Sequence, residues 1–132
     1  MKIYYRLDIN TNSSKQSYKF VTKLLGKNPS ETKSKFNKNQ EFNVWSLEKV
    51  SLVGDEYIDY FGEFLMLLEG KYKGLEEHGI SRNDISFWLL YEYDEQCNLE
   101  FPAEKLEKIG KEGISICISC WQKEKLIEIK NT

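Results

Sequence analysis

Residue types that build metal, redox and catalytic sites are scarce in this sequence. It has one histidine and three cysteines in 132 residues. An odd number of cysteines, in a chain long enough to bury its own core, is typical of free thiols in a reducing cytosol. No stretch approaches the ~20 consecutive apolar residues of a membrane span, and the first residues lack the basic and apolar regions of a signal peptide. We therefore expect a cytoplasmic protein that does not bind a membrane.

An excess of charge of one sign is also absent. The 19 basic and 21 acidic residues give a net charge of -2, so no overall positive field attracts a polyanion. Nucleic acid is therefore disfavoured as a partner. Hydrophobic residues make up 40% of the chain and charged residues 30%, which is too apolar for a disordered protein. A chain of this length can bury one core, and we expect a single domain over residues 1–132.

The few candidate metal ligands and catalytic bases have simpler explanations. Cys117 and Cys120 have the Cys-x-x-Cys spacing of zinc and redox sites, but they fall in a predicted strand, where residues three apart point to opposite faces. Adding Cys97 and His78 gives four nominal ligands, at a spacing that matches no common zinc finger. His78 ends a predicted helix, a position that suits an imidazole without a role in hydrolysis. We expect no catalytic residue, no metal and no cofactor, and therefore no enzyme.

Hydrophobic periodicity predicts eight elements, since apolar residues recur with period two in strands and at i, i+3, i+4 in helices. In chain order they are a strand over 2–9, a helix over 15–25, a strand over 42–47, a helix over 58–75, strands over 84–93 and 98–101, a short helix from Pro102, and a strand over 114–121. Residues 27–40 are predicted to form a long surface loop, and residues 125–129 extend the sheet or add an edge strand. The predicted fold is a two-layer α+β sandwich with a mixed, mostly antiparallel sheet and helices on one face, ferredoxin-like.

Start and stop residues support the predicted helices. Ser13 or Ser14 caps the first helix and Gly26 ends it, as expected from capping preferences. Gly70 lies inside the pattern over 58–75 and costs ~1 kcal/mol relative to alanine, so a kink or fraying is expected there. The helix from Pro102 points Leu106 inward.

A short turn at residues 94–96 is predicted to join two strands. The strand over 84–93 and the segment 98–101 then form an antiparallel hairpin, because both are rich in residues that favour strands.

Aromatic residues are the one compositional excess, at 14%, and several fall on the sheet face away from the core. If helices cover only one side of the sheet, two tryptophans and a tyrosine are left partly exposed there, which is typical of a protein-binding patch. Alternatively, the C-terminal segment or a homodimer contact covers the two tryptophans. The candidate partner-binding residues are this face together with the acidic turn beside it: Tyr4, Arg6, Asp8, Trp88, Glu92, Asp94, Glu95 and Trp121.

Three stretches carry a resemblance to a known family. They are Leu24-Leu25-Gly26 followed by Pro29, Trp45-Ser46-Leu47, and Leu99-Glu100-Phe101-Pro102-Ala103-Glu104-Lys105-Leu106 through Gly113-Ile114-Ser115-Ile116. In these the chain resembles the bacterial family called domain of unknown function 4279. Members often end the last strand with acidic and tyrosine residues, whereas this chain has Cys117-Ile118-Ser119-Cys120-Trp121, so a site built from those acids is not carried over. Small proteins of this kind look similar to immunity proteins of bacterial toxin–antitoxin systems, which bind and neutralise one toxin.

Three functions are therefore considered. The leading hypothesis is a non-catalytic module of the immunity type, which binds its toxin through the aromatic sheet face and the acidic turn, since charge complementarity to a basic toxin speeds association. The first alternative is binding of single-stranded RNA or other single-stranded nucleic acid, with sheet aromatics stacking on bases and the lysines of residues 27–38 contacting phosphates. The second is an uncharacterised enzyme, which requires a concave pocket with perturbed carboxylates.

Overall fold

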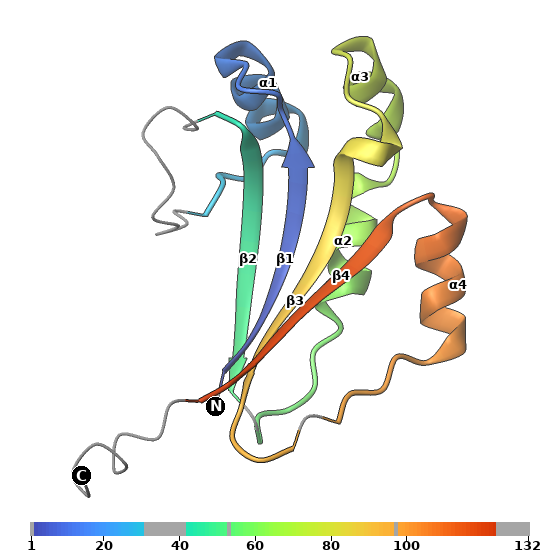
Figure 1. The fold of residues 1–132 in the computed structure, drawn as a ribbon. Helices are drawn as coiled ribbons and strands as arrows, with labels where there is room; N and C mark the ends of the chain where they lie inside the picture. Colours follow the sequence, from blue (N-terminus) through green and yellow to red (C-terminus); the bar gives the residue numbers. More distant parts are fainter. Residues whose placement is uncertain (1, 31–41, 53, 97, 124–132) are drawn as a thin grey trace, which may run out of the picture.

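The predicted two-layer α+β architecture is confirmed. The computed structural model describes residues 2–30, 42–52, 54–96 and 98–123, and all helices of these segments lie behind one face of a single sheet (Figure 1). The elements are β1 (Lys2–Asn10), α1 (Lys15–Leu25), β2 (Val44–Leu52), α2 (Tyr60–Leu68), α3 (Tyr72–Glu77), a 3₁₀ turn (Arg82–Asp84), β3 (Ile85–Tyr93), α4 (Ala103–Lys111) and β4 (Ser115–Gln122). Most of the predicted loop over 27–40 and the segment 125–129 lie outside the described residues.

The four strands form a mixed sheet in the order β2-β1-β3-β4. β1 is antiparallel to β2 and to β3, whereas β3 and β4 are parallel. A parallel pair needs a crossover connection, which α4 provides between β3 and β4. The ferredoxin-like description holds for the two layers but not for the connections between strands. In this chain α2 and α3 connect β2 to β3, where a ferredoxin-like fold has a short turn.

The core lies between the sheet and the helices. Alternation along β1 turns Leu7 and Ile9 toward the helices, and the register sets Leu7 between Leu47 of β2 and Phe87 of β3. All four side chains are buried, so one row of large apolar residues crosses three strands. The core residues contributed by the helices are Val21, Leu25, Phe61, Phe64, Leu68, Leu75 and Ile109.

Helix α1 confirms the predicted bounds and stop signal. The Ser14 hydroxyl accepts a hydrogen bond from the Ser17 amide at 3.1 Å, so Ser14 is the cap. Gly26 ends the helix with φ of 66°, a left-handed conformation that glycine adopts without strain. Trp45 then joins the helix to β2, since its Nε1 donates to Thr22 Oγ1 at 3.0 Å.

The prediction of one helix over 58–75 is wrong. The segment forms two helices, α2 and α3, and Gly70 between them has φ of 75°. A right-handed helix cannot continue through a left-handed residue, so the chain turns at Gly70 while the apolar stripe continues on both sides. No helix in the described segments is long and apolar enough to cross a membrane.

The predicted hairpin is also wrong, because residues 98–101 form no strand. β3 pairs with β1 along one edge and with β4 along the other, so it has no free edge for a following strand. The segment instead leads to α4. Leu106 of that helix is 45% exposed, against the prediction that it points inward. β2 begins at Val44 and runs to Leu52, five residues beyond the predicted strand.

Candidate functional site

The strand register defines a sheet face on which no helix of the described segments packs, called the open face below. Directly paired residues share a face, and Arg6 pairs with Glu48 on one side and with Trp88 on the other. The same rule places Tyr4, Asp8, Glu92 and Trp121 on this face. The register thus brings all six predicted sheet residues together, and their role in binding stays a prediction.

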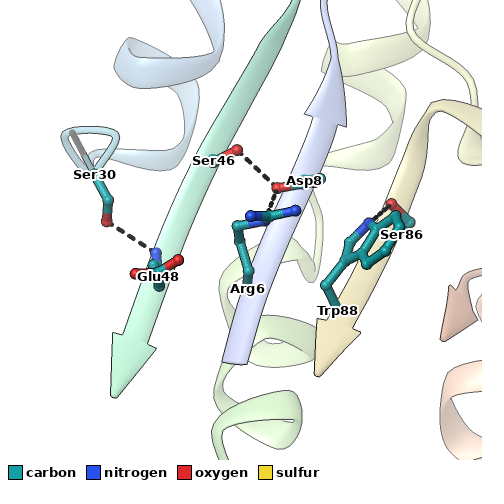
Figure 2. A network of polar contacts seen from close by, with 7 residues as sticks. All are labelled: Arg6, Asp8, Ser30, Ser46, Glu48, Ser86 and Trp88. Atoms are coloured by element: carbon teal, nitrogen blue, oxygen red, sulfur yellow. Dashed lines mark hydrogen bonds and ion pairs between the residues drawn. The ribbon is translucent and has the colours of Figure 1, made fainter. Parts of the chain in front are cut away.

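Asp8 is the centre of a polar network on the open face. Its Oδ1 accepts a hydrogen bond from Ser46 Oγ at 2.7 Å and lies 2.9 Å from Arg6 Nε, as Figure 2 shows. The Asp8 side chain is only 13% exposed, although no helix of the described residues covers it. Burial raises the pKa of this carboxyl, and the Ser46 hydroxyl and the Arg6 guanidinium offset part of that effect.

Trp88 lies beside this network. Its indole Nε1 donates to Ser86 Oγ at 3.0 Å, and the Arg6 guanidinium carbon lies 5.5 Å from the centre of its ring (Figure 2). The two contacts fix the ring orientation, and the side chain remains partly exposed. Tryptophan and arginine are the residues that most often dominate the energy of protein interfaces. The pair therefore forms a rigid anchor in the middle of the face.

Apolar side chains surround the anchor. Val50, Tyr4 and Leu90 form one row across β2, β1 and β3. Leu52 lies at the end of β2, and Trp121 on β4 is 40% exposed. Trp121 Nε1 donates to Glu92 Oε2 at 3.3 Å, which orients its ring. An apolar surface that contains ordered rings and is edged by carboxylates is suited to protein binding.

Val50 and Leu52 are site residues that the sequence interpretation missed, because it ended the strand at residue 47. The signal is that polar and apolar residues continue to alternate after residue 47, but with the apolar residues at the even positions and no longer at the odd ones. In the second half of β2, Val50 and Leu52 lie on the open face, while Lys49 and Ser51 lie on the helix side, where they pair with Tyr5 and Ile3. The apolar positions of this strand thus change sides.

The predicted acidic turn lies at the edge of the open face where β3 ends. Asp94 and Glu95 are exposed, and the backbone carbonyl of Asp94 accepts a hydrogen bond from Gln122 Nε2 at 3.1 Å. The contact holds the turn against the end of β4. Together with Glu92 it places three carboxylates along one side of the face.

The two edges of the sheet differ. Ser30 bridges the outer edge of β2, because its amide donates to the Ser46 carbonyl at 2.8 Å and its hydroxyl accepts from the Glu48 amide at 2.9 Å. Figure 2 shows the second contact. At the other edge, β4 has no strand partner on its outer side among the described residues, and its sequence contains no charged residue. Unpaired, uncharged edges of this kind are prone to pair with other chains.

Cys117 and Cys120 lie on opposite faces, as predicted. Cys117 pairs with Trp88 on the open face, and Cys120 pairs with Tyr91 on the helix side, so the two thiols cannot share one ion. In the part of the chain that the structure describes, no three His, Cys, Asp or Glu side chains are grouped as a metal site. His78 stacks on Phe20 with the ring centres 3.4 Å apart, a packing role at the end of α3.

Comparisons with models of known protein families, with curated proteins and with solved structures find no significant match. The resemblance to domain of unknown function 4279 therefore stays a prediction. The open face, with its contacts, is the observation on which a functional proposal rests.

Proposed function

We propose that this chain is a non-catalytic binding module of the immunity type, which neutralises a bacterial toxin by covering part of its surface with the open face. The observation that carries the proposal is the pair of ordered, partly exposed rings, Trp88 and Trp121, on a sheet face that no helix covers within the described part of the chain. The interface anchor, Trp88 with Arg6, is already oriented in the free protein. Binding therefore requires little loss of side-chain freedom.

The charges of the open face favour a protein partner over RNA. The Arg6 guanidinium lies 5.5 Å from the centre of the Trp88 ring, and Asp8 already pairs with it at 2.9 Å. Glu48 and Glu92 lie on the same face, and nucleic-acid surfaces need a surplus of positive charge to contact phosphates. A basic protein surface, such as that of a nuclease toxin, matches this pattern and is attracted by the acidic turn.

The cavity and the carboxyl with a raised pKa lie on opposite sides of the sheet, which favours binding over acid–base catalysis by that carboxyl. A cavity of about 770 Å³ lies on the helix side of the sheet, between α2 and α4. Asp8, the carboxyl with a raised pKa, lies on the open face. An enzyme that used Asp8 as an acid or a base would need the pocket beside it, and here the sheet separates the two.

The test is the affinity for the protein encoded by the adjacent gene, measured by calorimetry with wild type and with the double variant Trp88→Ala/Trp121→Ala. Truncating both partly exposed tryptophan rings of the open face, the central Trp88 included, is expected to weaken binding by about 100-fold or more. Met66→Ala is the matched control, because Met66 is 74% exposed on α2, on the other side of the molecule. Its affinity should stay within about twofold of wild type.

Two results contradict the proposal. One is the absence of any binding to the neighbour-encoded protein, which removes the immunity assignment. The other is a double variant that binds as tightly as wild type while Met66→Ala does not, which moves the interface to the helices. A titration with single-stranded RNA at several salt concentrations tests the nucleic-acid alternative. Binding that strengthens as the salt is lowered would support it, because this is the signature of phosphate contacts.

A further inference from the structure

The cavity between α2 and α4 has the size of a small-molecule site. Its volume is about 770 Å³, within the range of about 300–1,000 Å³ that ligand pockets occupy. Ile3, Tyr5 and Leu89 of the sheet line it, together with Phe61 of α2 and Ile109 of α4. The lining runs along α2 from Asp59 to Met66, a distance of about 10 Å at the rise of an α-helix. The space is therefore long enough for an extended chain.

The cavity is apolar and its mouth is rimmed by exposed apolar side chains. Tyr57, Met66, Leu99 and Leu106 line it, and all four are among the large hydrophobic residues that remain exposed. The adjoining row of the core is closed, since Leu7 and Phe87 have no exposed surface. Unfilled apolar space destabilises a protein, because its lining loses packing contacts. An apolar ligand would restore those contacts.

The charges around the cavity favour a ligand with a positive charge. Four carboxylates and two ammonium groups line it, and the ion pair between Lys105 Nζ and Asp59 Oδ2, at 3.2 Å, neutralises one of each. The other carboxylates, Glu63, Glu100 and Glu104, form no ion pair with the described residues. They outnumber the remaining cation, Lys108, so the mouth attracts positive charge.

Lys105 shows how an ammonium group is held at this mouth. Its Nζ donates to the Tyr57 hydroxyl at 2.9 Å and lies 4.6 Å from the centre of that ring. The Tyr57 hydrogen bond first, and then Asp59, raise the pKa of Lys105. Tyrosine rings beside carboxylates are the arrangement by which proteins recognise ammonium ligands. Tyr5 and Tyr60 also line the cavity, so further ring surface is available to a ligand.

We infer that this cavity binds an extended apolar molecule with a positively charged amine end, its apolar chain lying between α2 and α4 and its cation at the acidic mouth. The site lies on the helix side of the sheet and is independent of the open face. A partner protein bound to the open face leaves it accessible.

The experiment is a calorimetric titration of the full chain with three probes of equal chain length: octyltrimethylammonium, octanol and octanoate. The two ions are kept below their micellar concentrations and octanol below its solubility limit. The cation is expected to bind about tenfold or more tightly than octanoate, with octanol between them. Glu63→Gln/Glu100→Gln/Glu104→Gln should lower the affinity for the cation about tenfold and leave that for octanol unchanged. Leu106→Trp places a larger side chain in the cavity from an exposed position. It should lower the affinity for all three probes about tenfold or more.

The control is Val50→Ala, which removes an exposed apolar side chain from the open face and should leave all three affinities unchanged. If Leu106→Trp loses the circular dichroism of the wild type, Leu99→Trp replaces it. The inference is overturned if no probe binds, if octanoate binds as tightly as the cation, or if a folded cavity-filling variant binds like wild type. None of these results bears on the neighbour-encoded partner.

Discussion

The two faces of the sheet differ most clearly at two adjacent residues of β3. Phe87 has no exposed surface, and its ring centre lies 5.4 Å from that of Phe61 and 5.6 Å from that of Phe64. Trp88, the next residue, points to the open face, where it contacts Arg6 and stays partly exposed. Both are large aromatic residues in the same strand. Their different exposure follows from which face of the sheet the helices of the described segments cover.

The largest expected effect compares Phe87→Ala with Trp88→Ala in urea unfolding. Phe87→Ala should lower the free energy of unfolding by about 3–5 kcal/mol, because it opens a cavity beside the rings of Phe61 and Phe64. Trp88→Ala should lower it by about 1 kcal/mol, since it removes a cation–π contact and one hydrogen bond at a partly exposed site. Equal losses would contradict the account, because they would mean that the two faces are equally buried.

A milder comparison uses the same substitution on both faces. Trp45→Phe removes a buried indole that donates to Thr22 at 3.0 Å, and it should lower the free energy of unfolding by about 1–2 kcal/mol. Trp121→Phe removes an indole that donates to Glu92 at 3.3 Å on the open face, and its effect should stay within about 0.5 kcal/mol. Thermal unfolding followed by circular dichroism gives both values. A larger loss for Trp121→Phe than for Trp45→Phe would show that the open face is covered.

The smallest effect is a pH dependence that arises from Asp8 on the open face. Its pKa is raised in the folded state above the ordinary value of 3.8, so the folded chain holds the proton more tightly than the unfolded chain does. The free energy of unfolding contributed by Asp8 is therefore greatest below pH 3.8 and falls as the pH rises through the raised pKa. Asp8→Asn should abolish this fall in urea unfolding measured from pH 3.5 to 7.

Ser46→Ala provides the matched variant for Asp8, because it removes the hydroxyl that donates to the carboxylate at 2.7 Å. Without that hydrogen bond the pKa of Asp8 should rise further, and the fall in stability should extend to higher pH. A stability of wild type that rises relative to Asp8→Asn over the same range would contradict the sign derived above.

Local patterns in the sequence predicted most of the fold. Alternation placed Arg6 and Trp88 on the same face, and the register, which pairs them directly, confirms this. The capping prediction for α1 is confirmed as well, because Gly26 adopts a positive φ. These features depend on residues close in the chain, which short-range rules describe well.

The errors come from interactions that no local pattern contains. Residues 98–101 favour a strand by composition, but β4 occupies the edge of β3 on which that strand would pair. Gly70 was expected to bend one helix, and its φ of 75° instead divides α2 from α3. Val50 and Leu52 lie on the opposite face from the earlier apolar residues of β2, and they become part of an apolar surface only because β1 lies beside them. The cavity between α2 and α4 likewise depends on the spacing of two helices far apart in the sequence.

The availability of the rings on the open face is the claim on which the proposed function depends. It is tested most directly by acrylamide quenching of three full-length variants that each retain one tryptophan, the other two being replaced by phenylalanine. The account predicts the strongest quenching for Trp121, which is 40% exposed, intermediate quenching for Trp88, and the weakest for Trp45, which is fully buried. If Trp88 and Trp121 are as protected as Trp45, the open face is covered and the account is contradicted.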